Sequence, residues 1–159
     1  FNRRYLEESL ERELSRARRQ DAALGIIMLD LDHFKDFNDT FGHDAGDVLL
    51  RELGALLQQH IRGSDVACRY GGEEFTLIMA GTSKEAACTR AEELRAAVKN
   101  LHLQHRRHPL GSITISAGVA LFPEHGDTAA AVMQAADAAL YQAKETGRDR
   151  VVAAGGGNA

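Results

Sequence analysis

Residues 65–80, DVACRYGGEEFTLIMA, contain two strand-like runs on either side of the adjacent glycines Gly71 and Gly72. Glycine readily adopts the positive φ angles that a tight hairpin turn requires. The stretch therefore predicts a β-hairpin, with Glu73 at its tip and Glu74 directly after it. A rigid tip would hold a carboxylate in a defined position, although glycines followed by acids also occur in ordinary solvated turns.

The elements around this hairpin follow from hydrophobic periodicity and from turn residues. Residues 24–32, LGIIMLDLD, are aliphatic and end in acids, which predicts a buried central strand that emerges at a polar site. We expect further strands at 112–122 and 150–153, and helices at about 4–19, 33–43, 44–61, 84–100 and 128–145. Residues 102–110, HLQHRRHPL, predict a basic loop or a short edge strand, and the tail 155–159 is expected to fray.

These elements follow one another in the order α-β-α-α-β-β-α-β-α-β. The sequence has no internal repeat and no linker long enough to divide it into two domains. We therefore expect one α+β domain over residues 1–159, with helices packed on a sheet that contains antiparallel strands. The chain starts inside a helical pattern and has no initiator Met. We expect it to be excised from a longer protein with an N-terminal sensory or regulatory region.

The composition sets limits on the class of protein. The 159 residues are 44% hydrophobic and 26% charged, with a net charge of −4, which excludes disorder, collagen-like repeats and a disulfide-stapled miniprotein. No long apolar run or signal peptide is present, so we expect a cytoplasmic domain without direct membrane contact. The acidic balance gives no reason to expect a nucleic-acid polymer as a partner. Cys68 and Cys88 are expected to be buried free thiols.

Asp30 and Asp32 lie two residues apart at the end of the central strand, so their side chains should point to the same side. Neighbouring carboxylates repel each other, and protonation or a divalent cation relieves the repulsion. Oxygen ligands of this kind suit Mg²⁺ that is bound together with substrate phosphates. The competing interpretation is a pair of strand-end residues that face water or cap the following helix.

Three motifs carry a resemblance to a known family: DLDHFKDFNDTFGHDAGD at 30–47, RYGGEEF at 69–75 and ADAALYQAKETGRDR at 136–150. In this order they resemble the GGDEF family of diguanylate cyclases, in the variant with Glu at the third position. The resemblance implies a palm-like fold similar to nucleotidyl cyclases, with a ferredoxin-like mixed sheet surrounded by helices and GGEEF on a β-hairpin. It also implies condensation of two GTP into cyclic di-GMP and two pyrophosphates across a homodimer interface.

The resemblance assigns metal-binding and catalytic roles to particular residues. It implies that Asp30, the carbonyl of Leu31 and Glu73 bind two Mg²⁺, with Mn²⁺ as an alternative, and that Asp32 is a weaker candidate ligand. Glu73 is also the family's usual proton acceptor, with Glu74 as a supporting acid. Lys35 would stabilise charge on the transition-state phosphoryl group.

Substrate recognition is implied in the same way. Asn38 and Asp47 correspond to guanine-binding residues, and His43 lies close to the substrate. A carboxylate accepts hydrogen bonds from guanine N1–H and N2–H but meets acceptors on adenine, so Asp47 favours GTP over ATP. An acid in the first turn of a helix is also favourable through the helix dipole alone. The remaining implied contacts to substrate are Phe34 with the amides of residues 33–35, Gly72, Lys144 and Arg148.

Lys144 and Arg148 are four residues apart and share one face if the helix extends that far. Their competing interpretation is compensation of the dipole at a helix end. Asp149 stands where the family commonly has Asn, and we expect little consequence, apart from a question about the packing of the last strand.

Arg62 and Asp65 form an RxxD pair at the spacing that the family uses for an allosteric, inhibitory cyclic di-GMP site. Arg62 would clamp phosphate or guanine with two hydrogen bonds, and Asp65 would accept from guanine. Glu93 stands where some members supply a second arginine. Feedback inhibition is therefore expected to be weaker, or to use Arg90 or Arg95.

Three features of the sequence bear on alternative interpretations. His102, His105 and His108 recur every third residue, but the neighbouring arginines and Pro109 favour a solvated loop over a metal site. A non-enzymatic receptor for GTP or cyclic di-GMP would be favoured by loss of a metal ligand or signature glycine, and these residues are all retained. A cyclase with altered base choice is opposed by the retained Asp47.

Overall fold

The computed structural model describes residues 3–155, so the expected fraying of residues 156–159 lies outside the described residues. The described chain contains five helices and seven strands. The helices are α1 (Arg3–Gln20), α2 (Phe34–Phe41), α3 (His43–Gln59), α4 (Lys84–Lys99) and α5 (Ala129–Glu145). The strands are β1 (Leu24–Leu31), β2 (Val66–Gly71), β3 (Glu74–Ala80), β4 (Gln104–His105), β5 (His108–Pro109), β6 (Ile115–Phe122) and β7 (Arg150–Ala153).

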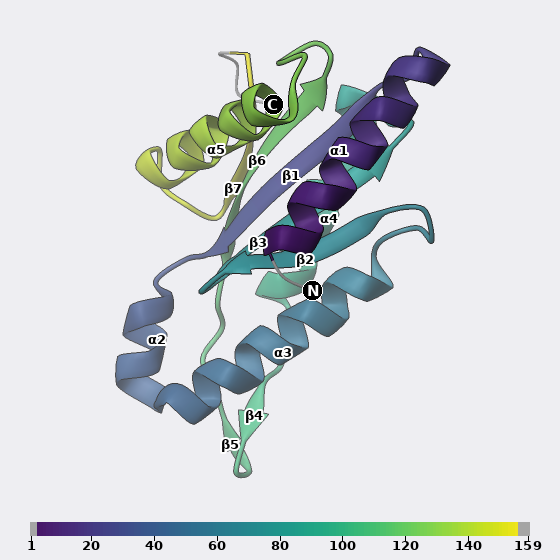
Figure 1. Cartoon of the computed structure of the whole chain (residues 1–159). Helices are drawn as coiled ribbons and strands as arrows, with labels where there is room; N and C mark the ends of the chain where they lie inside the picture. Colours follow the sequence, from purple (N-terminus) through teal and green to yellow (C-terminus); the bar gives the residue numbers. More distant parts are fainter. Residues whose placement is uncertain (1–2, 156–159) are drawn as a thin grey trace.

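The main sheet has the strand order β2-β3-β1-β6-β7, with β1 at its centre (Figure 1). Strand β1 pairs antiparallel with both β3 and β6, whereas β7 lies parallel to β6. The first four of these strands, with their connecting helices, form the β-α-β-β-α-β arrangement of a ferredoxin-like core. The predicted α+β fold with a mixed sheet is therefore confirmed.

Helices cover both faces of the sheet, and alternate residues of β1 pack on opposite faces. Ile27, Leu29 and Leu31 belong to one core cluster with apolar residues of α3 and α4. Ile26 and Met28 belong to a second cluster with α1 and α5. Because both faces of β1 are covered, the strand is apolar until Asp30, where it reaches the polar end of the sheet.

Several boundaries differ from the sequence expectation. Helix α3 ends at Gln59, before Ile61. Helix α5 ends at Glu145, as expected, so Arg148 lies outside the helix. Strand β6 begins at Ile115, three residues later than expected. Cys68 is buried, but Cys88 is only half-buried because it lines an open pocket beside α4.

Residues 102–110 do not join the main sheet. Strands β4 and β5 form a separate two-stranded hairpin, whose turn consists of Arg106 and Arg107 at φ 52° and 66°. This hairpin extends from the body of the molecule near the start of α3 (Figure 1). None of the helices in residues 3–155 combines the length and apolar character that a membrane crossing needs.

Candidate functional site

The end of β1 and the β2–β3 turn meet at one place in the structure. Asp30 pairs with Glu74 across the β1–β3 ladder, and the Leu31 N–H donates to the Glu73 carbonyl at 3.4 Å. The turn itself consists of Gly72 and Glu73, as the sequence predicted for Glu73. The strand pairing therefore brings Glu73 next to the end of β1.

The signature turn needs only one of its two glycines in a left-handed conformation. Gly72 has φ 46°, whereas Gly71 is not among the positive-φ residues. The Arg69 Nε–H donates to the Gly72 carbonyl at 2.8 Å and so stabilises the turn. Sequence reasoning missed Arg69, although it directly precedes the YGG segment.

Asp30 and Glu74 lie in an environment that disfavours their charge. Burial raises the pKa of Asp30 to about 7; Lys144 opposes this shift, and Glu73 and Glu74 add to it. Burial also raises the pKa of Glu74, with Asp137 and Glu73 contributing. Asp30 Oδ1 is buried and has no hydrogen-bond partner. The site therefore has an excess of negative charge, and Asp30 Oδ1 lies within it without a hydrogen-bond partner.

Residues 3–155 contain no group of three or more His, Cys, Asp or Glu side chains that could hold a metal ion. Mg²⁺ is often bound by one or two carboxylates, with water and substrate phosphates completing its coordination. Asp30, with its unpartnered Oδ1, and the neighbouring Glu73 fit such an incomplete ligand set.

Asp32 differs from Asp30 because its oxygens already have protein donors. The Ser116 hydroxyl donates to Asp32 Oδ1 at 2.7 Å, and the Thr114 hydroxyl donates to Oδ2 at 2.7 Å. The Asp149 N–H also donates to Oδ2, at 3.0 Å. These partners favour a positioning role for Asp32 over a ligand role.

Lys144 joins the two strand-end aspartates. Its Nζ lies 3.5 Å from Asp30 Oδ2 and 3.6 Å from Asp32 Oδ1, so both carboxylates point to the same side, as expected. Arg148 follows the end of α5 at φ 62°, and its Nη1 donates to the Lys144 carbonyl at 3.4 Å. The two cations are therefore adjacent through a turn after α5. Lys35 is exposed in the first turn of α2.

A second group of predicted residues gathers between α2 and α3. A Cβ added at Gly46 would overlap Asn38 Oδ1 and lie 3.3 Å from the Phe34 ring. Gly46 therefore permits the close approach of the two helices, while Asn38 Oδ1 is buried without a partner. Asp47 is the next residue and is exposed. Gly46 was missed, although it stands between His43 and Asp47 in the motif.

His43 faces a different feature. It lines an open pocket of about 540 Å³ together with His105 and His108 of the β4–β5 hairpin. Arg106 of this hairpin lies 3.4 Å from Asp44, through Nη2 and Oδ2. The structure thus places His43 beside the basic hairpin.

The RxxD pair is joined in the structure. The Asp65 side chain is fully buried and accepts from the Arg62 N–H at 3.0 Å. The Arg62 guanidinium donates to both Asp65 oxygens, at 3.2 and 3.3 Å, and to the Ala80 carbonyl at 2.7 Å. In this structure the fork of the Arg62 guanidinium is therefore occupied by Asp65, and both Asp65 oxygens are engaged by Arg62.

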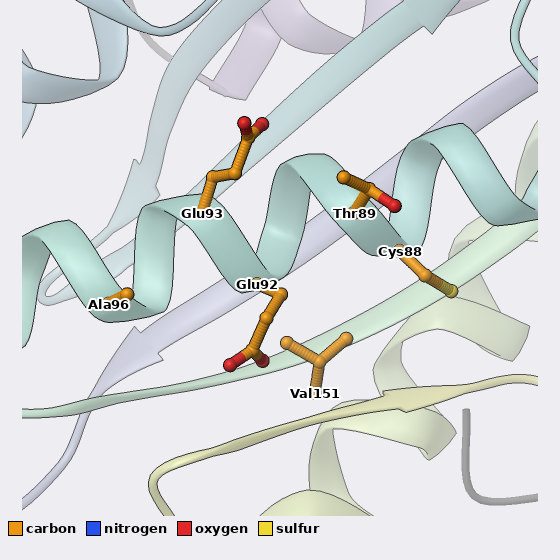
Figure 2. A pocket seen from close by; sticks show the side chains of 6 residues that line it. All are labelled: Cys88, Thr89, Glu92, Glu93, Ala96 and Val151. Carbon is orange, nitrogen blue, oxygen red and sulfur yellow. The ribbon is translucent and has the colours of Figure 1, made fainter.

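Arg90 and Arg95 could each replace the arginine that is absent at position 93, and they lie in different surroundings. Arg90 donates to the carbonyl of His60, two residues before Arg62. Arg95 instead donates to Asp149. Figure 2 shows Glu93 projecting from α4 away from β7. Arg90 is the candidate closer to the RxxD pair.

The fold and the site define the class of protein: a ferredoxin-like α+β domain with an acidic site between its central strand and a glycine turn. Residues 1–150 match the family described as diguanylate cyclase, GGDEF domain. The chain belongs to this family.

Individual relatives support the assignment. Diguanylate cyclase DgcP of Pseudomonas aeruginosa is 44% identical over 150 residues, which are 94% of this chain and 22% of DgcP. The GGDEF domain of DgcB from Caulobacter crescentus, solved in complex with c-di-GMP, has a TM-score of 0.89 and 37% identity, covering 96% of this chain and 90% of that chain. The active GGEEF domain of a diguanylate cyclase from Vibrio cholerae has a TM-score of 0.90 and 33% identity, covering 98% of each chain. The chain thus spans about a fifth of DgcP and nearly all of the two solved domains.

Proposed function

We propose that this domain is a diguanylate cyclase, which condenses two GTP into cyclic di-GMP and two pyrophosphates. The observation that carries the proposal is the buried, unpartnered Oδ1 of Asp30 beside Glu73. Family membership supports the same reaction, and the related DgcB domain was solved in complex with c-di-GMP.

In the proposed complex, Asn38 and Asp47 bind guanine, with His43 close to the substrate. The unpartnered Oδ1 of Asn38 supports its role. The triphosphate is held by Lys35, Lys144 and Arg148, by Gly72 at the signature turn, and by the amides at the start of α2 beside Phe34.

Each 3′-oxygen forms a bond to the α-phosphorus of the other GTP. The α–β anhydride bond breaks, and pyrophosphate leaves with the electron pair. Glu73 accepts the proton of the 3′-hydroxyl, Glu74 supports it, and Lys35 stabilises the charge on the phosphoryl group. Asp30, Glu73 and the Leu31 carbonyl would hold two Mg²⁺, or Mn²⁺, which lower the pKa of the 3′-hydroxyl and neutralise phosphate charge when bound.

Two copies of the domain must face each other, because each contributes one GTP to two reciprocal attacks. The proposed assembly is therefore a symmetric homodimer, and an upstream segment would control how often the copies meet. We place the reaction in the cytoplasm.

Product formation should rise faster than linearly with protein concentration when the domain is incubated with GTP and Mg²⁺. The reason is that the active species is a dimer whose fraction grows with concentration. Chromatography of the products over a range of protein concentrations checks this. Absence of product from an artificially dimerised domain that still binds GTP or cyclic di-GMP would favour the alternative function, a receptor for these nucleotides.

We further propose that Arg62 and Asp65 form an inhibitory product site. Replacing Arg62 by Ala should weaken inhibition by cyclic di-GMP by at least about tenfold, because the guanidinium fork is lost. The matched variant Arg62→Lys keeps the charge beside buried Asp65 and should also weaken inhibition. Conversely, Glu93→Arg should strengthen it. Initial rates at increasing cyclic di-GMP measure these effects, and unchanged inhibition in both Arg62 variants would exclude the site.

A further inference from the structure

We propose that an ion-pair clamp, formed by Arg95, Lys99 and Asp149, positions the cations Lys144 and Arg148 for the triphosphate. The inference rests on the proposed function and extends it to side chains outside the site. Arg95 and Lys99 belong to α4, and Asp149 belongs to the turn between α5 and β7.

Both oxygens of Asp149 are engaged by the clamp. Arg95 Nη1 lies 2.6 Å from Oδ1, and Lys99 Nζ lies 2.8 Å from Oδ2. Burial opposes ionisation of Asp149, but the hydrogen bonds from Lys99 and Arg95 outweigh it and hold its pKa below the ordinary value. The sequence predicted little consequence of having Asp instead of Asn at position 149. In the structure, Asp149 connects the turn to α4.

The turn needs such support because of its backbone conformation. Arg148 and Asp149 have φ 62° and 47°, in the left-handed region that is unfavourable for residues other than glycine. Two consecutive residues of this kind cost backbone energy, which contacts from neighbouring elements can offset. The contacts between α4 and Asp149 supply that restraint from outside the turn.

The same turn leads directly to the proposed triphosphate site. The Asp149 N–H donates to Asp32 Oδ2 at 3.0 Å, and Asp32 Oδ1 lies 3.6 Å from Lys144 Nζ. Arg148 in turn donates to the Lys144 carbonyl at 3.4 Å, and its buried Nε has no partner. Asp149 therefore acts through Asp32 and Arg148, as a positioning residue.

Glu92 offers a matched control on the same helix. Arg95 donates to Glu92 through Nε, at 2.9 Å to Oε1 and 3.0 Å to Oε2, and through Nη2 to Oε1. Within residues 3–155, Glu92 makes no hydrogen bond or ion pair with the turn. Figure 2 shows Glu92 projecting from α4 toward Val151 of β7, at an open pocket of about 570 Å³. Glu92→Gln removes the charge on the other side of Arg95, but the amide oxygen can still accept from Arg95, so we expect Asp149 to keep its partners.

Steady-state kinetics test the clamp. Asp149→Ala and Arg95→Gln should raise the KM for GTP about five- to tenfold and change kcat less than twofold. Asp149→Asn should restore part of the loss, because Asn tolerates left-handed backbone and still accepts a hydrogen bond at one of the two positions, but has no charge for the ion pairs. Glu92→Gln should stay within twofold of the wild type. A merely structural residue would instead lower kcat and the melting temperature without rescue by Asn.

A readout without turnover separates this inference from the proposed function. Hydrogen exchange of the Arg148 and Asp149 amides in the unliganded protein should be faster in Asp149→Ala and Arg95→Gln and unchanged in Glu92→Gln. If the wild type binds no 3′-deoxy-GTP and makes no product, the proposed function is wrong, while the exchange rates still decide whether the clamp holds the turn. If Asp149→Ala and Arg95→Gln both showed wild-type amide exchange rates and a wild-type KM for GTP, the proposed clamp would be wrong.

Discussion

Replacing Glu73 by Gln is expected to lower the rate of cyclic di-GMP formation by at least about a hundredfold, with the fold intact. Gln has nearly the same shape as Glu, but it cannot accept the 3′-hydroxyl proton and is a poor ligand for Mg²⁺. Glu73 is half-buried in the turn beside Asp30, and its charge contributes to the raised pKa of Asp30. Removing that charge relieves repulsion, so the variant should fold normally. Product chromatography measures the rate, and circular dichroism checks the fold.

The neighbouring acid supplies the control. Glu74→Gln removes one charge from the same end of the sheet, at the residue that pairs with Asp30 in the β1–β3 ladder. It should reduce the rate less than Glu73→Gln does, since Glu74 is only a supporting acid in the proposed mechanism. If Glu73→Gln kept more than a tenth of the wild-type rate, Glu73 would be neither the proton acceptor nor an essential ligand.

Replacing Asp30 by Asn should have opposite effects on activity and stability. Loss of a proposed metal ligand should reduce the rate by at least about a hundredfold. The pKa of Asp30 is about 7 in the folded protein, because of burial, against about 3.9 in the unfolded chain. The folded state therefore binds more protons between these values, and the stability of the metal-free protein falls as pH rises from about 4 to 7. Asn does not titrate, so it removes this loss.

The size of the stability gain follows from the pKa shift. A shift of about three units corresponds to at most about 4 kcal/mol, and solvent screening reduces this to about 1–2 kcal/mol. Urea unfolding in the presence of a chelator, at pH 5 and pH 8, should show a larger gain for Asp30→Asn at pH 8. The control Asp32→Asn should lose stability, since Asp32 accepts three hydrogen bonds. If Asp30→Asn were less stable than the wild type at pH 8, ionised Asp30 would not destabilise the folded protein.

Much of the fold could be predicted because its signals are local. The continuous apolar run of β1, the apolar faces of α1, α3, α4 and α5, and the paired glycines between β2 and β3 all act over a few residues. The same local geometry explains why Asp30 and Asp32 point to one side. Helix ends were less predictable, because the apolar pattern of α3 continues to Ile61 while the helix stops at Gln59.

The differences between chemically similar residues arise from segments that are distant in the sequence. Asp30 and Asp32 are both aspartates at one strand end, yet Thr114, Ser116 and Asp149 satisfy only Asp32. Asp30 is left with a buried oxygen without a partner and a raised pKa. These three donors lie outside residues 30–47, so the motif around Asp30 and Asp32 could not distinguish the two aspartates.

Periodicity and turn residues were sufficient to locate the five strands of the main sheet, the helices and the acidic turn, since backbone preferences depend on near neighbours. The closeness of Gly46 to Asn38 and the link from Arg95 to Asp149 became visible only when the helices were packed. Burial and hydrogen-bond donors from remote segments set the charge and position of each group, because electrostatic environment is a property of the assembled site and not of the local chain.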